Sequence, residues 1–398
     1  MTPVANGATV DNAHTNLHSG DHLVEPSEDV QLSDTFLSDA RFLSFFLTLW
    51  PERLRSLELQ KLAVIFFTIS SCASMNMLNL CHKAAGSRQK LIDWLYMLQI
   101  ENHDDEGDKL DWGFRPSEWL MIPNEKSKSS EGSKTFLPCI SRCYDGSHLT
   151  MTHAALLSLI CLEDDLERVK REEILKSVAQ MQQKSGCFSC TMHEGEEDVR
   201  FVYAAVAICF ILNDFSRIDT DRVVHFILSC LNPAGGAFGQ RPAGEAHAGC
   251  TYLALASLKL MGRLDVLSEE QKSQMVTWLV SRQLRGFNGR PSKDEDTCYF
   301  FWTGASLSIL GFYYLVDHKA ARMFASTCKG GSGGFKKTAD AGEADPLHTH
   351  CVISALALDP EANAISPELL LPLHDALDIP QKYYLHLKQL HASWCTNQ

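Results

Sequence analysis

Two kinds of helical pattern alternate along most of this chain. One kind is amphipathic, with its apolar residues on a single helix face. A clear example is formed by Val223, Val224, Ile227, Leu228 and Leu231. The other kind, such as the run from Ala204 to Leu212, is apolar on nearly every side and rich in small residues, so we expect it to be buried all round. Strand-like alternation is absent, which predicts an all-α fold.

The two patterns recur as an internal repeat, each copy running from a Gly-aromatic turn through a polar loop into an apolar helix. The turn phenylalanines, spaced 50, 49 and 48 residues apart, are Phe188, Phe238, Phe287 and Phe335. Phe114 is predicted to open an earlier copy, 74 residues before Phe188. A period of about 50 residues indicates one repeated supersecondary unit. We therefore expect an α/α toroid, in which amphipathic helices surround a ring of buried ones and the loops that open the inner helices meet at one rim.

The predicted toroid is a single domain over residues 35–394. Residues 1–34 lack periodicity, and we expect them to form a disordered tail. Ser38 and Asp39 are placed to cap the first helix, which would end before Pro51. The polar stretch at about 124–134 is predicted to be a flexible surface insertion.

Composition narrows the class of protein. The chain has 398 residues, with 36 Lys and Arg against 49 Asp and Glu, and its net charge of −13 argues against non-specific binding of nucleic acid. The first thirty residues contain no apolar signal region, and the longest clean apolar runs are shorter than the roughly 20 residues that span a bilayer. Fourteen cysteines at irregular spacings then indicate a reducing, cytoplasmic setting in which most are small buried hydrophobes.

The rim loops contain a possible metal site. Asp296, Cys298 and His348 offer a carboxylate, a thiolate and an imidazole, and three such ligands leave a fourth position open, as in catalytic zinc sites. A D-x-C motif is common, and the structural alternative is that Cys298 packs in the core while Asp296 and His348 cap their helices. Their common placement in the rim loops favours the metal.

Cations from three repeats are predicted at the same rim: His247, Arg290, Lys293 and Lys337. Such a cluster would bind a polyphosphate leaving group. The alternative is that Arg290 and Lys293 form ordinary surface ion pairs with the acidic run 294–296. Aromatic residues of the inner helices would line an apolar cavity or belong to the core. They are Phe201, Tyr203, Phe300 and Trp302.

Several motifs give the chain a resemblance to a known family. They include an FF pair near the start of the folded region, WPER at 50–53, DVRFVY at 198–203, HAGCT at 247–251, GRPSKDEDTCYFFW at 289–302 and DPLHTH at 345–350. From Phe42 to Trp394 the chain resembles the β subunits of the CaaX protein prenyltransferases, most closely that of type I geranylgeranyltransferase. The resemblance implies transfer of a geranylgeranyl group from its diphosphate to the cysteine of a C-terminal CaaX motif, with Leu preferred as the last residue.

The resemblance also assigns roles to residues. Asp296, Cys298 and His348 match the family's zinc ligands, and the substrate cysteine takes the open position as a thiolate nucleophile. The diphosphate-binding set is matched by His247, Arg290, Lys293 and Tyr299. Arg200 matches a residue that helps to place the CaaX peptide. Tyr203 and Trp302 are expected beside the isoprenoid.

Two positions distinguish the isoprenoid donor and the metal requirement. Ala63 stands where farnesyltransferases carry a tryptophan, and its small side chain leaves space for the longer geranylgeranyl group. Lys337 stands where farnesyltransferases carry an aspartate that recruits Mg²⁺, so we expect weak or no Mg²⁺ dependence. Lys336 is the substitute if the register shifts by one residue.

The resemblance places the last residue of the peptide in a pocket made by Ala63, His148, Thr150 and Phe201. This pocket departs from the family pattern, because Thr150 replaces a smaller alanine. Cys351 also replaces an aromatic residue near the CaaX site.

The family implies a heterodimer with a helical-repeat α subunit that farnesyltransferase shares, one Zn²⁺ per β subunit, and Rho- or Rac-like small GTPases as substrates. The alternatives are a farnesyltransferase β subunit, a Rab-type geranylgeranyltransferase β subunit, a terpene cyclase and a non-catalytic helical scaffold. Ala63 discriminates against the first. The acidic run 294–297 only half resembles the D-x-D-D motif of terpene cyclases, and a cyclase would have no use for Cys298.

Overall fold

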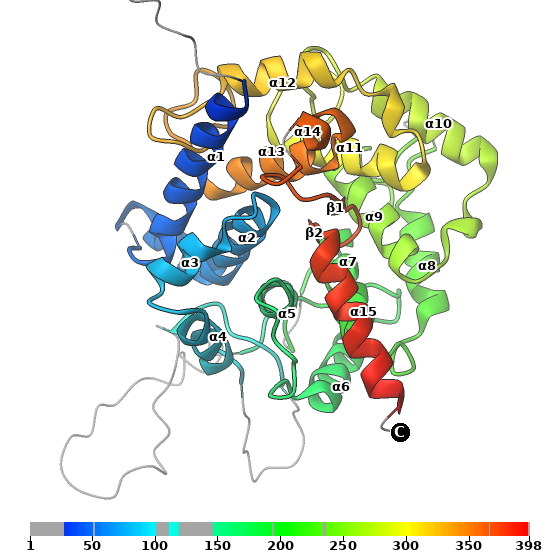
Figure 1. Cartoon of the computed structure of the whole chain (residues 1–398). Helices are drawn as coiled ribbons and strands as arrows, with labels where there is room; N and C mark the ends of the chain where they lie inside the picture. The colour runs from blue at the N-terminus through cyan, green and yellow to red at the C-terminus, as the bar shows by residue number, and fades with distance from the viewer. Residues whose placement is uncertain are drawn as a thin grey trace, which may run out of the picture.

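The computed structural model describes residues 28–50, 52–100, 111–118, 146–192, 195–233, 236–365 and 367–396. The helices that are apolar on all sides form an inner ring (Figure 1). They are α2 (Lys61–Ser74), α5 (Leu149–Cys161), α7 (Val199–Ile211), α9 (Ala248–Leu260), α11 (Cys298–Leu310) and α13 (Pro346–Leu358). Each contacts the next along the chain, and α13 contacts α2, which closes the ring. The predicted α/α toroid is therefore confirmed.

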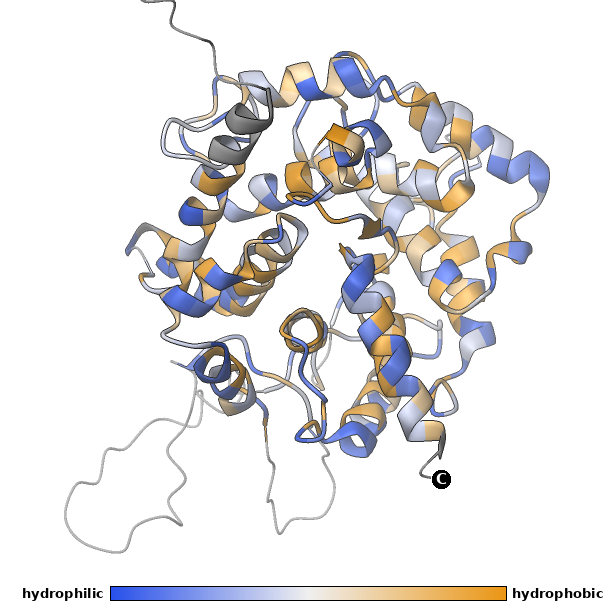
Figure 2. Ribbon diagram, viewed as in Figure 1, coloured by the Kyte–Doolittle hydropathy of each residue, from blue (hydrophilic) through white to orange (hydrophobic). Residues whose placement is uncertain are grey.

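A second layer of helices surrounds the ring (Figure 1). It consists of α1 (Glu28–Ser44), α3 (Leu78–Ala84), α4 (Arg88–Met97), α6 (Arg171–Met181), α8 (Thr220–Ser229), α10 (Glu269–Val280) and α12 (His318–Thr327). Figure 2 shows α5 end-on with apolar residues on every side, whereas the outer helices also carry polar residues. The two hydrophobic patterns of the sequence therefore correspond to the two layers.

Short elements join and cap these layers. They are the 3-10 helices η1 (Phe45–Leu47), η2 (Glu52–Gln60), η6 (Leu264–Val266) and η7 (Tyr313–Leu315), the helices α14 (Pro360–Ile365) and α15 (Gln381–Thr396), and the strands β1 (Leu373–His374) and β2 (Ile379–Pro380).

The Gly-aromatic turn of each repeat has the same backbone arrangement. An isolated antiparallel bridge joins each turn phenylalanine to a residue just after the preceding outer helix. The pairs are Gln99–Phe114, Gln182–Phe188, Leu231–Phe238, Gln283–Phe287 and Lys329–Phe335. All of these phenylalanine side chains are buried. Phe114 therefore opens an earlier copy of the repeat, as predicted.

The first helix differs from its prediction. It begins at Glu28, ten residues before Ser38, so residues 28–34 are helical rather than part of a tail. These first turns are polar in sequence and leave no hydrophobic period to detect. Residues 1–27 of the predicted tail and the predicted insertion at 124–134 lie outside the described residues.

Asp39 does not cap this helix but ties it to the last repeat. The carboxylate is fully buried, pairs with the Lys329 ammonium and accepts a hydrogen bond of 2.6 Å from the Gly334 amide. Gly334 has a φ of +74°, and an added Cβ would lie 2.6 Å from the Phe42 ring. The chain therefore needs glycine here to bring α1 against the final turn.

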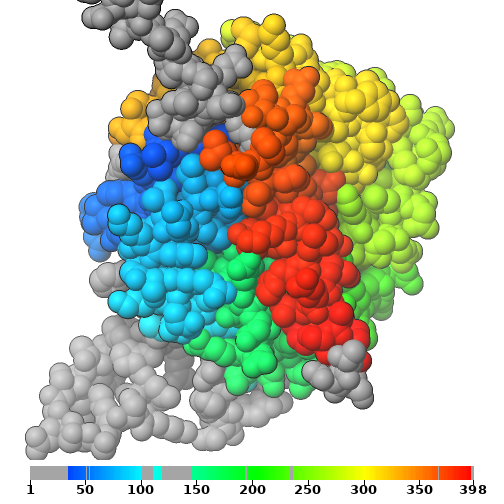
Figure 3. Space-filling view, viewed as in Figure 1, coloured from blue at the N-terminus to red at the C-terminus, as the bar shows by residue number. Residues whose placement is uncertain are grey.

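A hairpin made by β1 and β2 closes one end of the ring, an element that the all-helical prediction did not contain. Its turn, residues 375–378, contacts the C-terminal ends of α9 and α11 and, further inside the ring, Tyr203 of α7. The Asp375 carboxylate binds the Lys259 ammonium at 2.6 Å and the Ser308 hydroxyl at 2.8 Å. The Tyr203 hydroxyl donates to the Ala376 carbonyl at 2.9 Å. Figure 3 shows the C-terminal segment, in orange and red, covering the middle of this face.

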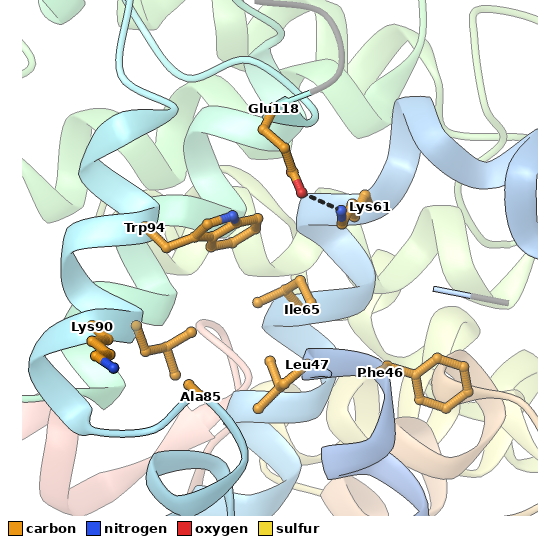
Figure 4. Close-up of a pocket in the computed structure, with 9 residues that line it drawn as sticks. Phe46, Leu47, Lys61, Ile65, Ala85, Lys90, Trp94 and Glu118 are labelled. Carbon is orange, nitrogen blue, oxygen red and sulfur yellow. Dashed lines mark hydrogen bonds and ion pairs between the residues drawn. The ribbon is translucent and has the colours of Figure 1, made fainter. Parts of the chain in front are cut away.

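A cavity of about 270 Å³ lies between α2 and α4 (Figure 4). The residues that line it show which side of α2 faces away from the ring. Lys61 and Ile65, one helical turn apart, line it together with Trp94, and the Lys61 ammonium pairs with Glu118 at 2.7 Å. Ala63 lies two residues from each, on the other side of α2. That side faces the ring, since Phe67, one turn further on, stacks on His350 of α13 with ring centroids 4.9 Å apart.

Within the described residues, one helical stretch, Leu54–Ser74, is long and apolar enough to cross a membrane by length and composition. Its window is 61% buried, and its α2 part packs inside the ring against α5 and α13. The core helix of a ring has the same composition as a membrane span.

The cysteines of the described residues are all free thiols, and most are buried. Burial raises the pKa of Cys161, Cys209 and Cys351, among others. These side chains act as small apolar residues, as predicted.

Replacing Asp375 should destabilise the closed ring. Asp375→Ala would leave the Lys259 ammonium and the Ser308 hydroxyl without their partner, and we expect a loss of about 2–3 kcal/mol in the free energy of unfolding. Urea unfolding of the purified protein measures this loss. Glu52→Ala, which removes a pair with Arg55 whose side chains are 86% and 81% exposed, is the control and should leave the midpoint nearly unchanged. Equal effects of the two substitutions would contradict this role of the hairpin.

Candidate active site

At the end of the ring opposite the hairpin, the same helix-capping position recurs in successive repeats. At the start of each inner helix from α5 onward, a polar side chain accepts a hydrogen bond from a backbone amide of the first turn. The accepting residues are His148, Asp198, His247, Asp296 and Asp345. Because the inner helices share one direction, these caps lie at one rim. His247 and Asp296 are therefore equivalent, whereas His348 is one turn further along its helix.

Asp296, Cys298 and His348 come together at this rim. Their ligand atoms all lie within 4.8 Å of one another, and the His348 Nε2 is 3.3 Å from a carboxylate oxygen of Asp296. Asp296 and Cys298 are 7% and 3% exposed. Asp296 caps α11, as the structural alternative expected, and its carboxylate also faces His348. A carboxylate, a thiol and an imidazole that converge in this way fit the ligands and open geometry of catalytic zinc.

Burial and neighbouring carboxylates shift the pKa values of Cys298 and His348. Burial raises the pKa of the Cys298 thiol well above its ordinary value. Burial alone would lower the pKa of His348, but hydrogen bonds to Asp296 and Asp345 outweigh it and raise this pKa to about 9. The site therefore has an excess of negative charge that holds a proton on the imidazole, and a divalent cation would satisfy the same carboxylates.

Asp345 is a functional candidate that sequence reasoning did not single out. Its Oδ2 lies 2.6 Å from the His348 Nδ1, which leaves Nε2 to face Asp296 and Cys298. Carboxylates that orient a metal-binding imidazole commonly occupy this position. The available signal was the D-x-x-H spacing at the start of a helix, which places both side chains on one face.

The predicted basic cluster is only partly assembled. The His247 Nε2 lies 3.1 Å from the Tyr299 hydroxyl, and the Lys337 ammonium lies 3.7 Å from the Asp296 carboxylate. Arg290 instead pairs with Glu245 of the neighbouring turn, and Lys293 is exposed. The ion-pair alternative therefore holds for Arg290, although its partner is not the acidic run that follows it.

The two lysines of the last turn point in different directions. The Lys336 ammonium donates to the Ala339 carbonyl at 2.6 Å, within its own loop. Lys337, rather than Lys336, is the lysine beside Asp296.

Three of the residues predicted for the peptide pocket, His148, Thr150 and Phe201, also meet at the rim. Burial lowers the pKa of His148 to about 4, and the neutral imidazole contacts the Thr150 hydroxyl at 2.9 Å through Nδ1. The Phe201 ring meets His148 edge-on at 6.3 Å. Arg200 is half-exposed and bonded through Nε to Asp198 at 2.7 Å.

Aromatic residues continue from the rim into the ring. Trp302 meets Tyr299 edge-on at 5.4 Å, and Tyr203 lies near Tyr252 deeper in the ring. Phe300 instead stacks on the turn residue Phe287 and belongs to the core.

Comparison with known proteins places this geometry in a family. The family described as "Prenyltransferase alpha-alpha toroid domain" matches residues 38–395. The chain belongs to this family of prenyltransferase α/α toroids.

Two relatives in this family are named as subunits of one type of prenyltransferase. The chain is 36% identical to the geranylgeranyl transferase type-1 subunit beta of Dictyostelium discoideum over 296 residues, which is 73% of this chain and 81% of that protein. It is 39% identical to the subunit of the same name from Arabidopsis thaliana over 58% of this chain and 64% of that protein. The solved structure of Candida albicans protein geranylgeranyltransferase-I complexed with GGPP has the same fold, with a TM-score of 0.74, 24% identity, and coverage of 89% of this chain and 98% of that one.

Substitution of Asp345 tests the metal site without removing a ligand. Asp345→Asn keeps the helix cap but removes the negative charge behind His348, and we expect zinc affinity to fall about 10- to 100-fold. Competition with a chromogenic chelator measures the affinity. Asp198→Asn, at the equivalent cap of α7, is the control and should leave it unchanged. Unchanged zinc affinity in Asp345→Asn would contradict the site.

Proposed function

We propose that this chain is the catalytic β subunit of a zinc-dependent type I protein geranylgeranyltransferase. The observation that supports this function best is the convergence of Asp296, Cys298 and His348 beside His247, Tyr299 and Lys337. A site for a thiol and a site for an anionic leaving group are thereby adjacent. The family and the two type-1 relatives support the same activity.

The nucleophile would be a cysteine thiolate of the substrate protein. Asp296, Cys298 and His348 would hold Zn²⁺, which when bound lowers the pKa of a thiol in its open position. Asp345 keeps the His348 imidazole in the orientation that this requires. The new bond forms between the thiol sulfur and the first carbon of the isoprenoid, and the thiol proton leaves to solvent.

The leaving group would be diphosphate. The bond between the first isoprenoid carbon and the diphosphate oxygen breaks, and its electron pair stays on that oxygen. Lys337, His247 and the Tyr299 hydroxyl donate to the charge that develops there. The proposed set also includes Arg290, which must exchange Glu245 for the diphosphate, and the exposed Lys293.

The substrates are inferred from the residues at the rim and from the family. Ala63 faces the ring and leaves space for geranylgeranyl, while Tyr203 and Trp302 line its path. His148, Thr150 and Phe201 would receive the last residue of a CaaX peptide, preferably Leu, and Arg200 would help to place the peptide. Small GTPases of the Rho and Rac kind are the proposed protein substrates, and the proposed site of action is the cytoplasm.

A heterodimer is the proposed working form. The type-1 relatives are named as subunits, and we infer an α subunit of helical repeats as the partner. The chain would carry the zinc and both substrate sites, while the partner would support them.

The terpene-cyclase alternative fits the rim poorly. Glu295 is used to accept hydrogen bonds from the Arg285 and Gly286 amides, and Asp296 faces His348. The acidic run therefore does not form a group of carboxylates directed into the ring. A scaffold would not need the polar convergence around Asp296.

Competition between two donors tests the proposed activity. The chain, co-expressed with an α subunit and supplied with Zn²⁺, should transfer geranylgeranyl in preference to farnesyl to a peptide ending in Leu. Ala63→Trp should reduce the space inside the ring and shift the preference toward farnesyl at least tenfold, because the larger side chain fills space that the longer lipid needs. Ala63→Ser is the size-matched control. Preferential farnesyl transfer by the unaltered protein would indicate the farnesyltransferase alternative.

The magnesium requirement tests the role of Lys337. Transfer by the unaltered heterodimer should be insensitive to Mg²⁺, because the ammonium already supplies positive charge. Lys337→Ala should slow transfer at least tenfold without changing zinc content. Lys336→Ala is the matched control and should have little effect. Equal losses of transfer rate in the two variants would contradict a specific role for Lys337.

A further inference from the structure

A main-chain hydrogen bond links every described junction between neighbouring repeats. The amide at the start of an inner helix donates to the carbonyl two residues beyond the next turn phenylalanine. The pairs are Leu62 to Pro116, Leu149 to Cys190, Val199 to Gln240, Ala248 to Gly289 and Thr297 to Lys337, at 2.8 to 3.2 Å. This bond fixes the position of each turn relative to the helix before it.

Thr297 adds a second bond at its junction. The corresponding residues at the other described junctions are leucine, valine or alanine, whose side chains cannot donate. The Thr297 hydroxyl donates to the Lys336 carbonyl at 2.9 Å, while its amide donates to the Lys337 carbonyl at 3.0 Å. Two successive carbonyls of the lysine turn are thus held by one residue that is 1% exposed.

This double attachment occurs where the turn approaches the metal site. Thr297 lies between Asp296 and Cys298, and the Lys337 ammonium is 3.7 Å from the Asp296 carboxylate. The Lys337 side chain is 61% exposed and flexible, so packing does little to fix its ammonium. Its direction depends on its backbone, which Thr297 holds. The same attachment leaves Lys336 directed at Ala339, away from the site.

We propose that Thr297 is a positioning residue for the leaving-group site. It fixes the backbone of residues 336 and 337 so that the Lys337 ammonium faces the diphosphate. It also couples Lys337 to Asp296 and Cys298, the two metal-site residues that flank Thr297 in the sequence. The inference rests on the proposed function, because it assigns Lys337 to a diphosphate.

Isosteric substitution separates the hydroxyl from the packing. Thr297→Val keeps the shape and removes the donor, whereas Thr297→Ser keeps the donor. Thr303→Val, within α11, is the control, because the Thr303 hydroxyl is buried without a hydrogen-bond partner in the described structure. The variants are prepared in the zinc-loaded heterodimer, alone and combined with Lys337→Ala. The readouts are zinc content, the KM for peptide, the single-turnover rate constant for transfer and the Kd for inorganic pyrophosphate.

Thr297→Val should slow transfer and weaken pyrophosphate binding about fivefold, the effect of one net hydrogen bond of about 1 kcal/mol. Zinc content and the KM for peptide should not change, and Thr297→Ser and Thr303→Val should behave like the unaltered protein. In the Lys337→Ala background the effect of Thr297→Val should disappear, because the lysine that it positions is gone.

Two results would overturn the inference. The first is a Thr297→Val effect of the same size with and without Lys337, which would mean a merely structural role. The second is no effect on pyrophosphate affinity. If the unaltered heterodimer transfers no prenyl group, the proposed function fails, but the pyrophosphate measurements still decide whether Thr297 positions Lys337.

Discussion

The burial of helices that are apolar on every side governs the rest of this structure. Such helices are stable only when neighbours cover them completely, and a closed ring with an outer layer provides that cover. Closure requires contact between α13 and α2. The Asp39–Lys329 pair and the hydrogen bond from the Ser70 hydroxyl to the Asp378 carbonyl of the hairpin turn tie the first and last parts of the chain together. The lysine and arginine residues of the inner helices, Lys61, Arg200 and Lys259, consequently lie at or near helix ends.

The shared direction of the inner helices explains why one rim carries the chemistry. All of their N-termini lie there, with partial positive charge and amides that require acceptors. The same cap position holds histidine or aspartate in successive repeats, and at Asp296 the capping carboxylate also faces His348 and Cys298. A rim of helix N-termini favours an anionic group, and the added Lys337 ammonium suits a diphosphate in particular. Because the hairpin covers the opposite end, a substrate of the proposed activity would reach the site from the rim.

The features of the fold and the site that follow from the internal repeat could be predicted from the sequence. The spacing of the turn phenylalanines predicted the ring, and the position of the loops predicted that Asp296, Cys298 and His348 would meet. Sequence reasoning failed where no period exists: the polar first turns of α1, and a hairpin of two-residue strands. It named Lys337 but left Lys336 as the substitute, because that difference depends on hydrogen bonds from Thr297 to the turn. It assigned Arg290 to the basic cluster or to the acidic run 294–296, because its observed partner, Glu245, lies 45 residues away.

We infer that Asp296, Cys298 and His348 at the rim hold zinc and leave one coordination position for a substrate thiol. Zinc K-edge X-ray absorption of the heterodimer tests it directly. We expect one sulfur ligand at about 2.3 Å in the unliganded enzyme and two after addition of a CaaX peptide, with one fewer in each state for Cys298→Ala. Two or more sulfur ligands before peptide is added, or a sulfur count that peptide does not change, would contradict it.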